Sequence, residues 1–293
     1  MWKAYKKWLQ EIRAQVDVDE KRLQISDGEI SYTDTGTGNP VLFVHGSIGG
    51  YGSGPMFMSW LCGHGFRVIC PSRPGFTHVP LRHGRTLVQQ AEYLYEILEK
   101  LDITKCSIIA HSGGGPVALE LLEKFPETFD KVIFLTAVGH KTKLTSLFAV
   151  KLFFNRPVIF FLYLLKRFLP DVYLWICVAH LKLDWSAIKA NASYQKQLLF
   201  HMESSFDAHL HRQGLCNDAR QFRRIISKAP CSYNVPAMII YATNDKRTGG
   251  THGPYLRKLF CDSQIVYSDT GGHHPLVSRD AQNFMKEIIT FLK

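Results

Sequence analysis

The residue whose type and setting most clearly indicate chemistry is Ser112. It stands in the string Ala110-His111-Ser112-Gly113-Gly114, between an apolar run that predicts a buried strand, Cys106 to Ala110, and a helical pattern, Val117 to Phe125. A serine between a strand and a helix, with small residues two before and two after it, is typical of a strained turn that exposes a nucleophilic hydroxyl. The amino end of the following helix also favours negative charge. We therefore expect Ser112 to be a nucleophile; the alternative is a helix N-cap on an inactive fold.

A serine nucleophile needs a general base, and the base needs a carboxylate that orients it. Two loops after predicted strands supply them, because Asp245 follows Ala237 to Ala242 and His273 follows Gln264 to Ser268. Active sites of parallel sheets lie at the carboxyl ends of the strands, so we expect the three side chains to meet there. Two alternatives stay open. Asp245 is also suited to stabilising a turn, and the neighbouring His274 competes for the role of base, although the two glycines before His273 favour His273.

Acyl transfer also needs two backbone N–H groups that point at the developing oxyanion. Gly113, directly after the proposed nucleophile, is the first candidate. The second should come from the loop after the apolar run Val41 to His45, which reads His45-Gly46-Ser47-Ile48-Gly49-Gly50. We expect the amide of Ser47 to be this second donor.

Four further histidines are candidates for lining the pocket, namely His45, His111, His140 and His274. We expect His45 to order its own loop, and His111 to neighbour the serine rather than act as base. His140 opens the segment after the sixth strand and is a candidate for the pocket wall. No group of His, Cys, Asp and Glu has the spacing of metal ligands, and the Gly-x-Gly pairs lack the acidic residue of a dinucleotide site. We expect neither a metal nor a cofactor.

The hydrophobic pattern predicts the elements that position these residues. Residues 23–33 alternate with a period of two around Asp27-Gly28, which predicts a hairpin with these two residues as its turn. Apolar runs that alternate with helical patterns then predict parallel strands. The alternation stops near Gly139 and resumes at Ala237. We expect an α/β core over residues 20–140 and 231–293, with a mostly parallel central sheet flanked by helices, and a helical cap over residues 141–230.

The order of these motifs resembles that of the α/β-hydrolase superfamily, over about residues 20–293. The resemblance rests on HGSIGG at 45–50, SRPGF at 72–76, AHSGGGP at 110–116, ND at 244–245 and GGHH at 271–274. More closely, the chain looks like a group of capped, bacterial-type hydrolases with a serine nucleophile. The resemblance implies an α/β-hydrolase fold with a helical cap inserted after the sixth strand.

The resemblance also implies roles for single residues. These are a Ser112–His273–Asp245 triad, with Gly113 and Ser47 at the oxyanion hole. Ala110 stands where glycine is commoner, and it is small enough that we expect no loss of activity. Ser112 stands where epoxide hydrolases and haloalkane dehalogenases of this fold carry aspartate, which disfavours both chemistries.

Positive charge is concentrated in two segments. The formal net charge is +10, and residues 141–230 hold 14 Lys and Arg against 5 Asp and Glu. Residues 1–19 predict a basic amphipathic helix, whose apolar positions at helical spacing are Trp2, Tyr5, Trp8, Leu9, Ile12 and Val16. Such a helix either packs its apolar stripe on the domain or lies at an anionic membrane surface. Nucleic acid is disfavoured as a partner, because the positive charge is mixed with apolar residues and no recognition motif accompanies it.

The predicted cap is rich in large apolar residues, which are dense between Phe148 and Ile176. Part of this surface is expected to cover the mouth of the site and accept an acyl or other apolar group, and its basic residues would suit an anionic bilayer. The alternative is a lid whose apolar faces pack on each other. No run is long enough for a transmembrane helix, and seven scattered cysteines without a CxxC pair predict a reducing compartment. We expect a cytoplasmic protein that either stays free or associates peripherally with a membrane; the sequence indicates no oligomeric state.

These features predict a serine hydrolase that cleaves a carboxylic ester or thioester of an apolar small molecule through an acyl-enzyme. Two alternatives stay open. One is hydrolysis of a carbon–carbon bond on the same triad, and the other is a non-catalytic protein that binds a ligand or a membrane surface on this fold.

Overall fold

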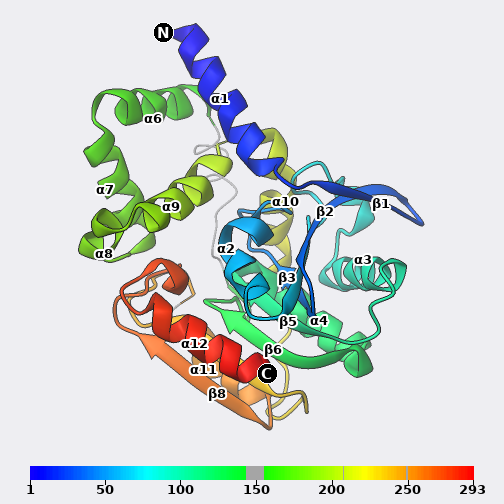
Figure 1. Ribbon diagram of the computed structural model, residues 1–293. Coiled ribbons are helices and arrows are strands. Elements are labelled where there is room, and N and C mark those ends of the chain that lie inside the picture. Colours follow the sequence, from blue (N-terminus) through cyan, green and yellow to red (C-terminus); the bar gives the residue numbers. More distant parts are fainter. Residues whose placement is uncertain (143–154, 207, 249) are drawn as a thin grey trace.

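The computed structural model describes residues 1–142, 155–206, 208–248 and 250–293, which form a central sheet covered by helices (Figure 1). The sheet has eight strands in the order β1-β2-β4-β3-β5-β6-β7-β8. Strands β3 to β8 run parallel, and β1 and β2 form an antiparallel hairpin at one edge. The strands are β1 (Lys21–Ile25), β2 (Gly28–Gly36), β3 (Asn39–Val44), β4 (Phe66–Pro71), β5 (Cys106–His111), β6 (Phe129–Leu135), β7 (Ala237–Ala242) and β8 (Ser263–Ser268).

Helices cover both faces of the sheet because its inner strands are apolar on both faces. Consecutive residues of β5 show this, since Ile108 belongs to the core under α3 and α4, and Ile109 belongs to the core under α2 and α12. The helices of this layer are α2 (Ser53–Cys62), α3 (Leu87–Lys100), α4 (Gly115–Lys124), α11 (His252–Leu259) and α12 (Ala281–Leu292). Short 3-10 turns lie at Leu81–His83, Ser112–Gly114, Pro126–Thr128 and Pro275–Val277. The mostly parallel α/β core that the sequence predicts is confirmed.

The hairpin forms where it is predicted, but its turn is shifted by one residue. Ile25 pairs with Gly28, so the two turn residues are Ser26 and Asp27, and Gly28 begins the second strand at φ +127°. The carboxylate of Glu96 on α3 accepts hydrogen bonds from the amide and the hydroxyl of Ser26, at 2.6 and 3.0 Å. The observed turn is thus held by a residue 70 positions away, a contact that the local Asp-Gly pattern does not reveal.

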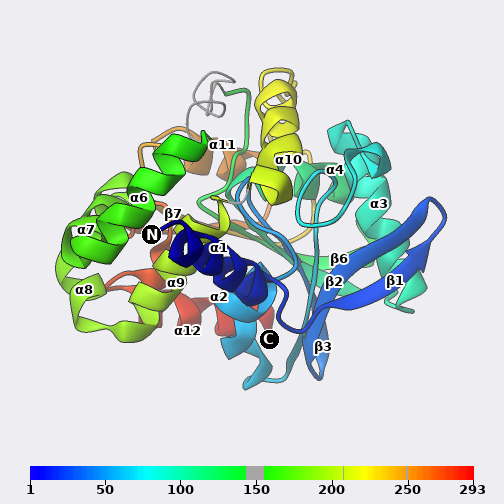
Figure 2. The same ribbon diagram turned by 90° about the horizontal axis from the view of Figure 1, so that it is seen from above.

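A helical insertion follows β6, as the sequence predicts. It comprises α6 (Arg156–Phe168), α7 (Pro170–Leu181), α8 (Trp185–Ala190), α9 (Ala192–Ser204) and α10 (Ala208–Gln221). We call these helices the cap. Figures 1 and 2 show α6 and α7 at the outer side of the cap and α9 between them and the core. The apolar residues between Phe148 and Phe154, which the sequence assigns to the cap, lie outside the described residues.

The N-terminal helix α1 (Trp2–Val16) packs on the cap (Figure 2). Tyr5, Trp8 and Ile12 are buried in one cluster with residues of α6, α7 and α9. The ring of Tyr5 meets that of Phe160 edge-on at 5.1 Å, and the ring of Trp8 lies 5.3 Å from that of Tyr163. Most of the apolar stripe of α1 therefore serves packing within the protein. No helix in the described ranges is long and apolar enough to cross a membrane.

Candidate active site

Ser112 lies at a sharp turn between β5 and α4. Its φ of +49° is in the left-handed region, which only a tightly packed turn maintains in a residue with a side chain. Small neighbours are required here, because a Cβ on Gly114 would lie 2.3 Å from the carbonyl oxygen of Val44. The residue two before the serine, Ala110, is fully buried. Sterics at this turn thus explain the string of small residues around Ser112.

A chain of hydrogen bonds joins Ser112, His273 and Asp245. The Oγ of Ser112 lies 2.9 Å from Nε2 of His273, and Nδ1 of His273 lies 2.8 Å from Oδ2 of Asp245. The three side chains follow β5, β8 and β7 and are buried. With Nδ1–H donating to the carboxylate, Nε2 is free to accept the serine proton. This arrangement can generate a serine nucleophile.

The loop of His273 is fixed by the cap as well as by the core. The amide of His273 donates to the carbonyl of Leu181 at the end of α7, at 2.9 Å. The side chain of Asn244 accepts from the amide of Gly272 and donates to the carbonyl of Lys182, at 2.9 and 2.8 Å. The ND and GGHH motifs therefore act together, since Asn244 ties the histidine loop to the turn that carries Asp245.

Asp245 is held as a carboxylate. Burial opposes its charge, but His273 and the donors of Thr248 and Arg247 outweigh this effect, so the pKa of Asp245 lies well below its usual range. The donors are the amide of Arg247 at 2.8 Å and the hydroxyl of Thr248 at 2.6 Å. A carboxylate that is ionised at all ordinary pH values keeps the imidazole oriented and stabilises it when it gains a proton.

Ser47 and Gly113 face each other beside the serine. A Cβ placed on Gly113 would lie 3.0 Å from the amide nitrogen of Ser47 and 3.1 Å from the ring of Phe222. The two residues that the sequence suggests for the oxyanion hole are thus neighbours in space. Gly113 also begins the run into α4, whose amino end favours negative charge at this point.

A buried ion pair that the sequence did not indicate lies behind Ser47. The hydroxyl of Ser47 donates to Oδ2 of Asp218 on the cap helix α10 at 2.7 Å. Oδ1 of Asp218 lies 2.6 Å from Nη2 of Arg73, and both side chains are almost completely buried. Arg73 also donates to Gln90, and its amide donates to Nε2 of His45. The cap therefore contributes a charged group to the support of the loop that carries Ser47.

Removal of the Ser47 hydroxyl tests this support. In Ser47→Ala the amide is retained, but the link to Asp218 is lost. We expect kcat to fall by roughly tenfold with little change in KM, a smaller loss than the 10²–10³-fold of a deleted oxyanion donor. The matched control is Ser186→Ala, which removes a hydroxyl that donates to a different cap carboxylate, that of Asp184. Equal kcat values in wild type and Ser47→Ala would show that the hydroxyl does not position the loop.

The other candidate histidines lie in three places. Both ring nitrogens of His45 are occupied, because Nδ1 lies 2.8 Å from the carbonyl of Gly46 in its own loop and Nε2 accepts from the amide of Arg73 in the loop after β4. His140 stacks on His252 with ring centroids 3.9 Å apart, against α11. His111 and His274 lie beside the base, with ring centroids 4.6 Å apart. The ring of His274 stacks on Phe57, whereas His273 holds both hydrogen bonds of the chain.

His201 of α9 completes this group and was not indicated by the sequence. Its ring lies 4.1 Å from that of His274 and 6.4 Å from that of His111. Burial lowers the pKa of all three, to about 3 for His111. Nothing in the local pattern of α9 marks His201 for this position, because its partners are residues of the core.

These buried neutral histidines make stability depend on pH. Burial also lowers the pKa of His45, so four fully buried imidazoles stay neutral in the folded protein. In the unfolded chain a histidine has a pKa near 6.5 and binds a proton below it. Stability is therefore nearly complete about one unit above pH 6.5 and falls as the pH decreases through that value, by about 1.4 kcal/mol per histidine between pH 7.5 and 5.5.

Urea unfolding at pH values of about 7.5, 6.5 and 5.5, which span the ordinary pKa of histidine, measures this loss. His201→Gln should reduce the pH dependence by about one proton. As a control, His64→Gln replaces an exposed histidine and should leave the pH dependence of stability unaltered. A free energy of unfolding that does not vary over this range would contradict the neutral state of the cluster.

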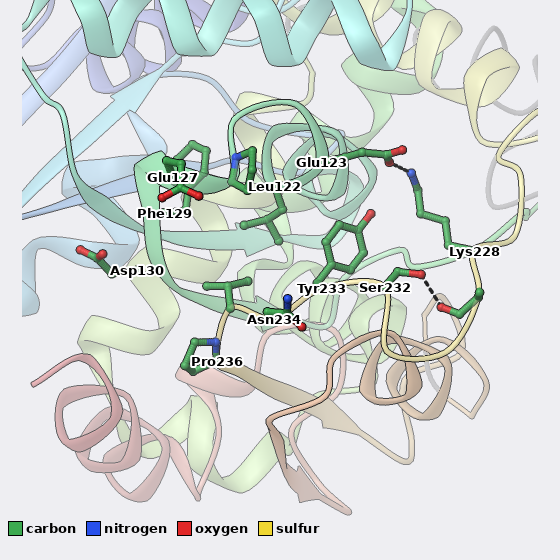
Figure 3. A pocket seen from close by; sticks show the side chains of 13 residues that line it. Leu122, Glu123, Glu127, Phe129, Asp130, Lys228, Ser232, Tyr233, Asn234 and Pro236 are labelled. Atoms are coloured by element: carbon green, nitrogen blue, oxygen red, sulfur yellow. Dashed lines mark hydrogen bonds and ion pairs between the residues drawn. The ribbon is translucent and has the colours of Figure 1, made fainter.

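A hollow lies at the amino ends of β6 and β7, away from the carboxyl ends of the strands that Ser112 and Asp245 follow (Figure 3). It has a volume of about 750 Å³ and lies between the end of α4 and the segment before β7. Lys228 at its rim forms ion pairs with Glu123 and Glu120, and the hydroxyl of Ser232 donates to the carbonyl of Ala229. Neither Ser112 nor its partners His273 and Asp245 line this hollow, so the hollow is separate from the candidate site.

The fold and the geometry of the site define an α/β-hydrolase. Residues 39–280 match the family described as alpha/beta hydrolase fold, so the chain belongs to this family. In structure it is similar to an alpha/beta hydrolase fold protein from Nakamurella multipartita, with a TM-score of 0.83, 23% identity and coverage of 93% of this chain and 98% of that one. An esterase from Exiguobacterium antarcticum has a TM-score of 0.70 at 18% identity, over 93% and 98% of the two chains.

Among curated relatives, the chain is similar in part to two hydrolases. It is 29% identical to 2-hydroxy-6-oxo-2,4-heptadienoate hydrolase of Pseudomonas putida over 143 residues, 45% of this chain and 49% of the relative. It is 29% identical to the uncharacterized hydrolase YcgS of Bacillus subtilis over 117 residues, 38% of this chain and 39% of the relative. The matched segments thus span less than half of either relative.

Proposed function

We propose that this protein is a serine hydrolase that cleaves a carboxylic ester or thioester of an apolar substrate through an acyl-enzyme on Ser112. The observation that supports it most is the buried chain of hydrogen bonds from Ser112 through His273 to Asp245. Ser112 lies on a strained turn, next to Ser47 and Gly113, the two residues suited to bind an oxyanion. The hydrolase family supplies the general class of reaction.

The reaction proceeds in two halves. As Oγ of Ser112 attacks the carbonyl carbon, its proton passes to Nε2 of His273, and the carbonyl electrons form an oxyanion that the amides of Ser47 and Gly113 stabilise. The intermediate expels the alcohol or thiol, which takes the proton from Nε2. A water molecule then gives a proton to Nε2 and attacks the acyl carbon. Release of the acid returns the proton to Ser112.

The preference for an apolar acyl group is supported by Phe222. Its ring comes within 3.1 Å of the Cβ position at Gly113, directly beside the serine. Phe222 follows α10, so the cap supplies an apolar wall next to the reacting carbon. Burial of acyl methylene groups against such a wall contributes about 0.8 kcal/mol for each group.

A series of p-nitrophenyl esters from acetate to laurate tests both parts of the proposal. We expect kcat/KM to rise from acetate to the medium chains, and Phe222→Ala to reduce the octanoate value by about tenfold or more while changing acetate less. The control Phe125→Ala removes a half-buried ring at the far end of α4. A series that peaks at acetate would contradict the apolar preference.

Hydrolysis of a carbon–carbon bond is the second candidate function, because the relative from Pseudomonas putida and a further partial relative are named as hydrolases of 2-hydroxy-6-oxo-dienoates. The latter, 2-hydroxy-6-oxo-6-phenylhexa-2,4-dienoate hydrolase of Comamonas testosteroni, is 30% identical over 128 residues, 42% of this chain and 44% of the relative. The same serine, base and oxyanion site would serve it. A protein that is inactive on the whole ester series but cleaves a vinylogous 1,5-diketone would establish this alternative. Activity on esters without cleavage of the diketone would exclude it.

A further inference from the structure

The outer side of the cap carries an exposed apolar surface. Of the twelve large apolar side chains that are exposed in the described ranges, six fall within residues 161–176, with exposed fractions from 37% to 61%. They are Phe161, Phe168, Leu169, Val172, Trp175 and Ile176, and we call them the outer cap face. Such clustering is unusual, because scattered single apolar residues are the norm on a protein surface.

The outer cap face lies on helices whose inner sides are already packed. On α7, Tyr173, Leu174, Cys177 and Val178 are buried in the cap core, while Val172, Trp175 and Ile176 occupy the opposite side. The residues from Arg167 to Val172, at the corner between α6 and α7, are all exposed. A helix that is apolar on all sides belongs in apolar surroundings. The inner contacts of α6 and α7 therefore leave one apolar side of the pair without a partner in the described structure.

The charge around this face favours an anionic partner. Residues 155–182 hold four basic residues, Arg156, Lys166, Arg167 and Lys182, against Asp171 alone. Lys166 is partly neutralised by Glu203, at 2.6 Å, but Arg167 is exposed beside Phe168. Helix α1 contacts α6, since Trp2, which is 56% exposed, meets the ring of Phe160. The same helix carries Lys3, Lys6 and Lys7, of which Lys7 pairs with Glu11. Basic side chains at the border of an aromatic-rich apolar face are typical of binding in a lipid interface.

We propose that the outer cap face docks on an anionic membrane surface, with the corner between α6 and α7 inserted among the lipids. A nucleic acid would contact the basic groups but would leave Val172, Trp175 and Ile176 in water. An anionic bilayer accommodates both kinds of side chain. The proposal goes beyond hydrolysis and holds whatever bond Ser112 cleaves. If the substrate is an apolar ester, docking through α7 also brings the membrane to a helix that touches the site, because the carbonyl of Leu181 at its end accepts a hydrogen bond from the amide of His273.

Co-sedimentation of the full chain with vesicles tests the proposal. One set is phosphatidylcholine alone, and the other contains one phosphatidylglycerol for every two phosphatidylcholines. The test variant is Phe168→Ser/Trp175→Ser. The matched control is Ile226→Ser/Tyr267→Ser, which removes two apolar side chains that are 83% and 61% exposed outside the cap helices. Because no turnover is measured, the result is independent of the proposed hydrolase activity.

We expect binding to the anionic vesicles, weaker binding to neutral ones and in high salt, and a loss of about tenfold or more in Phe168→Ser/Trp175→Ser but not in the control. Equal binding of both double variants would overturn the proposal. So would a lack of vesicle binding in the wild type. In that case, light scattering that shows a dimer lost in the test variant would assign the face to a second copy of the chain. A gel shift with single-stranded RNA would assign the positive charge to nucleic acid.

Discussion

Replacement of Ser112 by alanine is expected to abolish hydrolysis while the protein stays folded. The alanine removes the only protein atom that forms a covalent bond with the substrate in the proposed reaction, and loss of the nucleophilic serine of a serine protease costs about 10⁶-fold in kcat. Serine already carries a Cβ at the φ of +49° of this turn, so alanine adds no backbone strain and fits the same conformation. Initial rates with the best p-nitrophenyl ester, together with a thermal melt, measure both expectations.

The control for this variant is Ser107→Ala, which changes a half-buried serine on the same strand, β5. It should keep wild-type activity. If Ser112→Ala retained more than a trace of activity on the ester while folded, another group would have to be the nucleophile.

The second large effect is expected for Asp245→Asn. The carboxylate accepts from His273, Arg247 and Thr248, and these donors stabilise the charged form and hold the pKa of Asp245 well below its usual range. An amide of the same shape donates a proton toward Nδ1 and favours the tautomer whose Nε2 carries a hydrogen. That imidazole cannot take the serine proton, so kcat should fall by about 10⁴-fold.

The size of this loss distinguishes a catalytic carboxylate from one that stabilises a turn. Asp269→Asn is the matched control, because its carboxylate also accepts from a nearby threonine, Thr243, but does not contact His273. We expect near-normal kcat in this control. A small effect of Asp245→Asn on kcat, combined with a lowered melting temperature, would assign Asp245 a structural role.

The parts of the site that the sequence predicts are those set by strand order. Ser112, Asp245 and His273 each follow a strand of a parallel sheet, and the carboxyl ends of such strands share one edge. The pairing of Ser47 with Gly113 follows for the same reason, because β3 and β5 are neighbours. The small residues around Ser112 also mark the turn in the sequence, because the turn has no room for larger side chains.

The residues that the sequence does not indicate lie on cap helices. Asp218 reaches Ser47 across 171 positions, and His201 meets His274 from α9. The position of a cap helix on the core depends on contacts between residues far apart in the sequence. The hydrophobic period of a single helix does not reveal these contacts. The same holds for α1, whose amphipathic stripe fits a membrane and a protein surface equally well by pattern. Its burial against Phe160 and Tyr163 is a tertiary outcome.

Labelling with a fluorophosphonate, followed by peptide mapping of the adduct, is the measurement that bears most directly on the proposed nucleophile. The reagent reports a serine activated by a base and does not require knowledge of the substrate. We predict a single adduct on Ser112 that disappears in His273→Ala and in Ser112→Ala. Folded protein that shows no adduct, or labelling of Ser112 that is unchanged in His273→Ala, would contradict a nucleophile activated by His273.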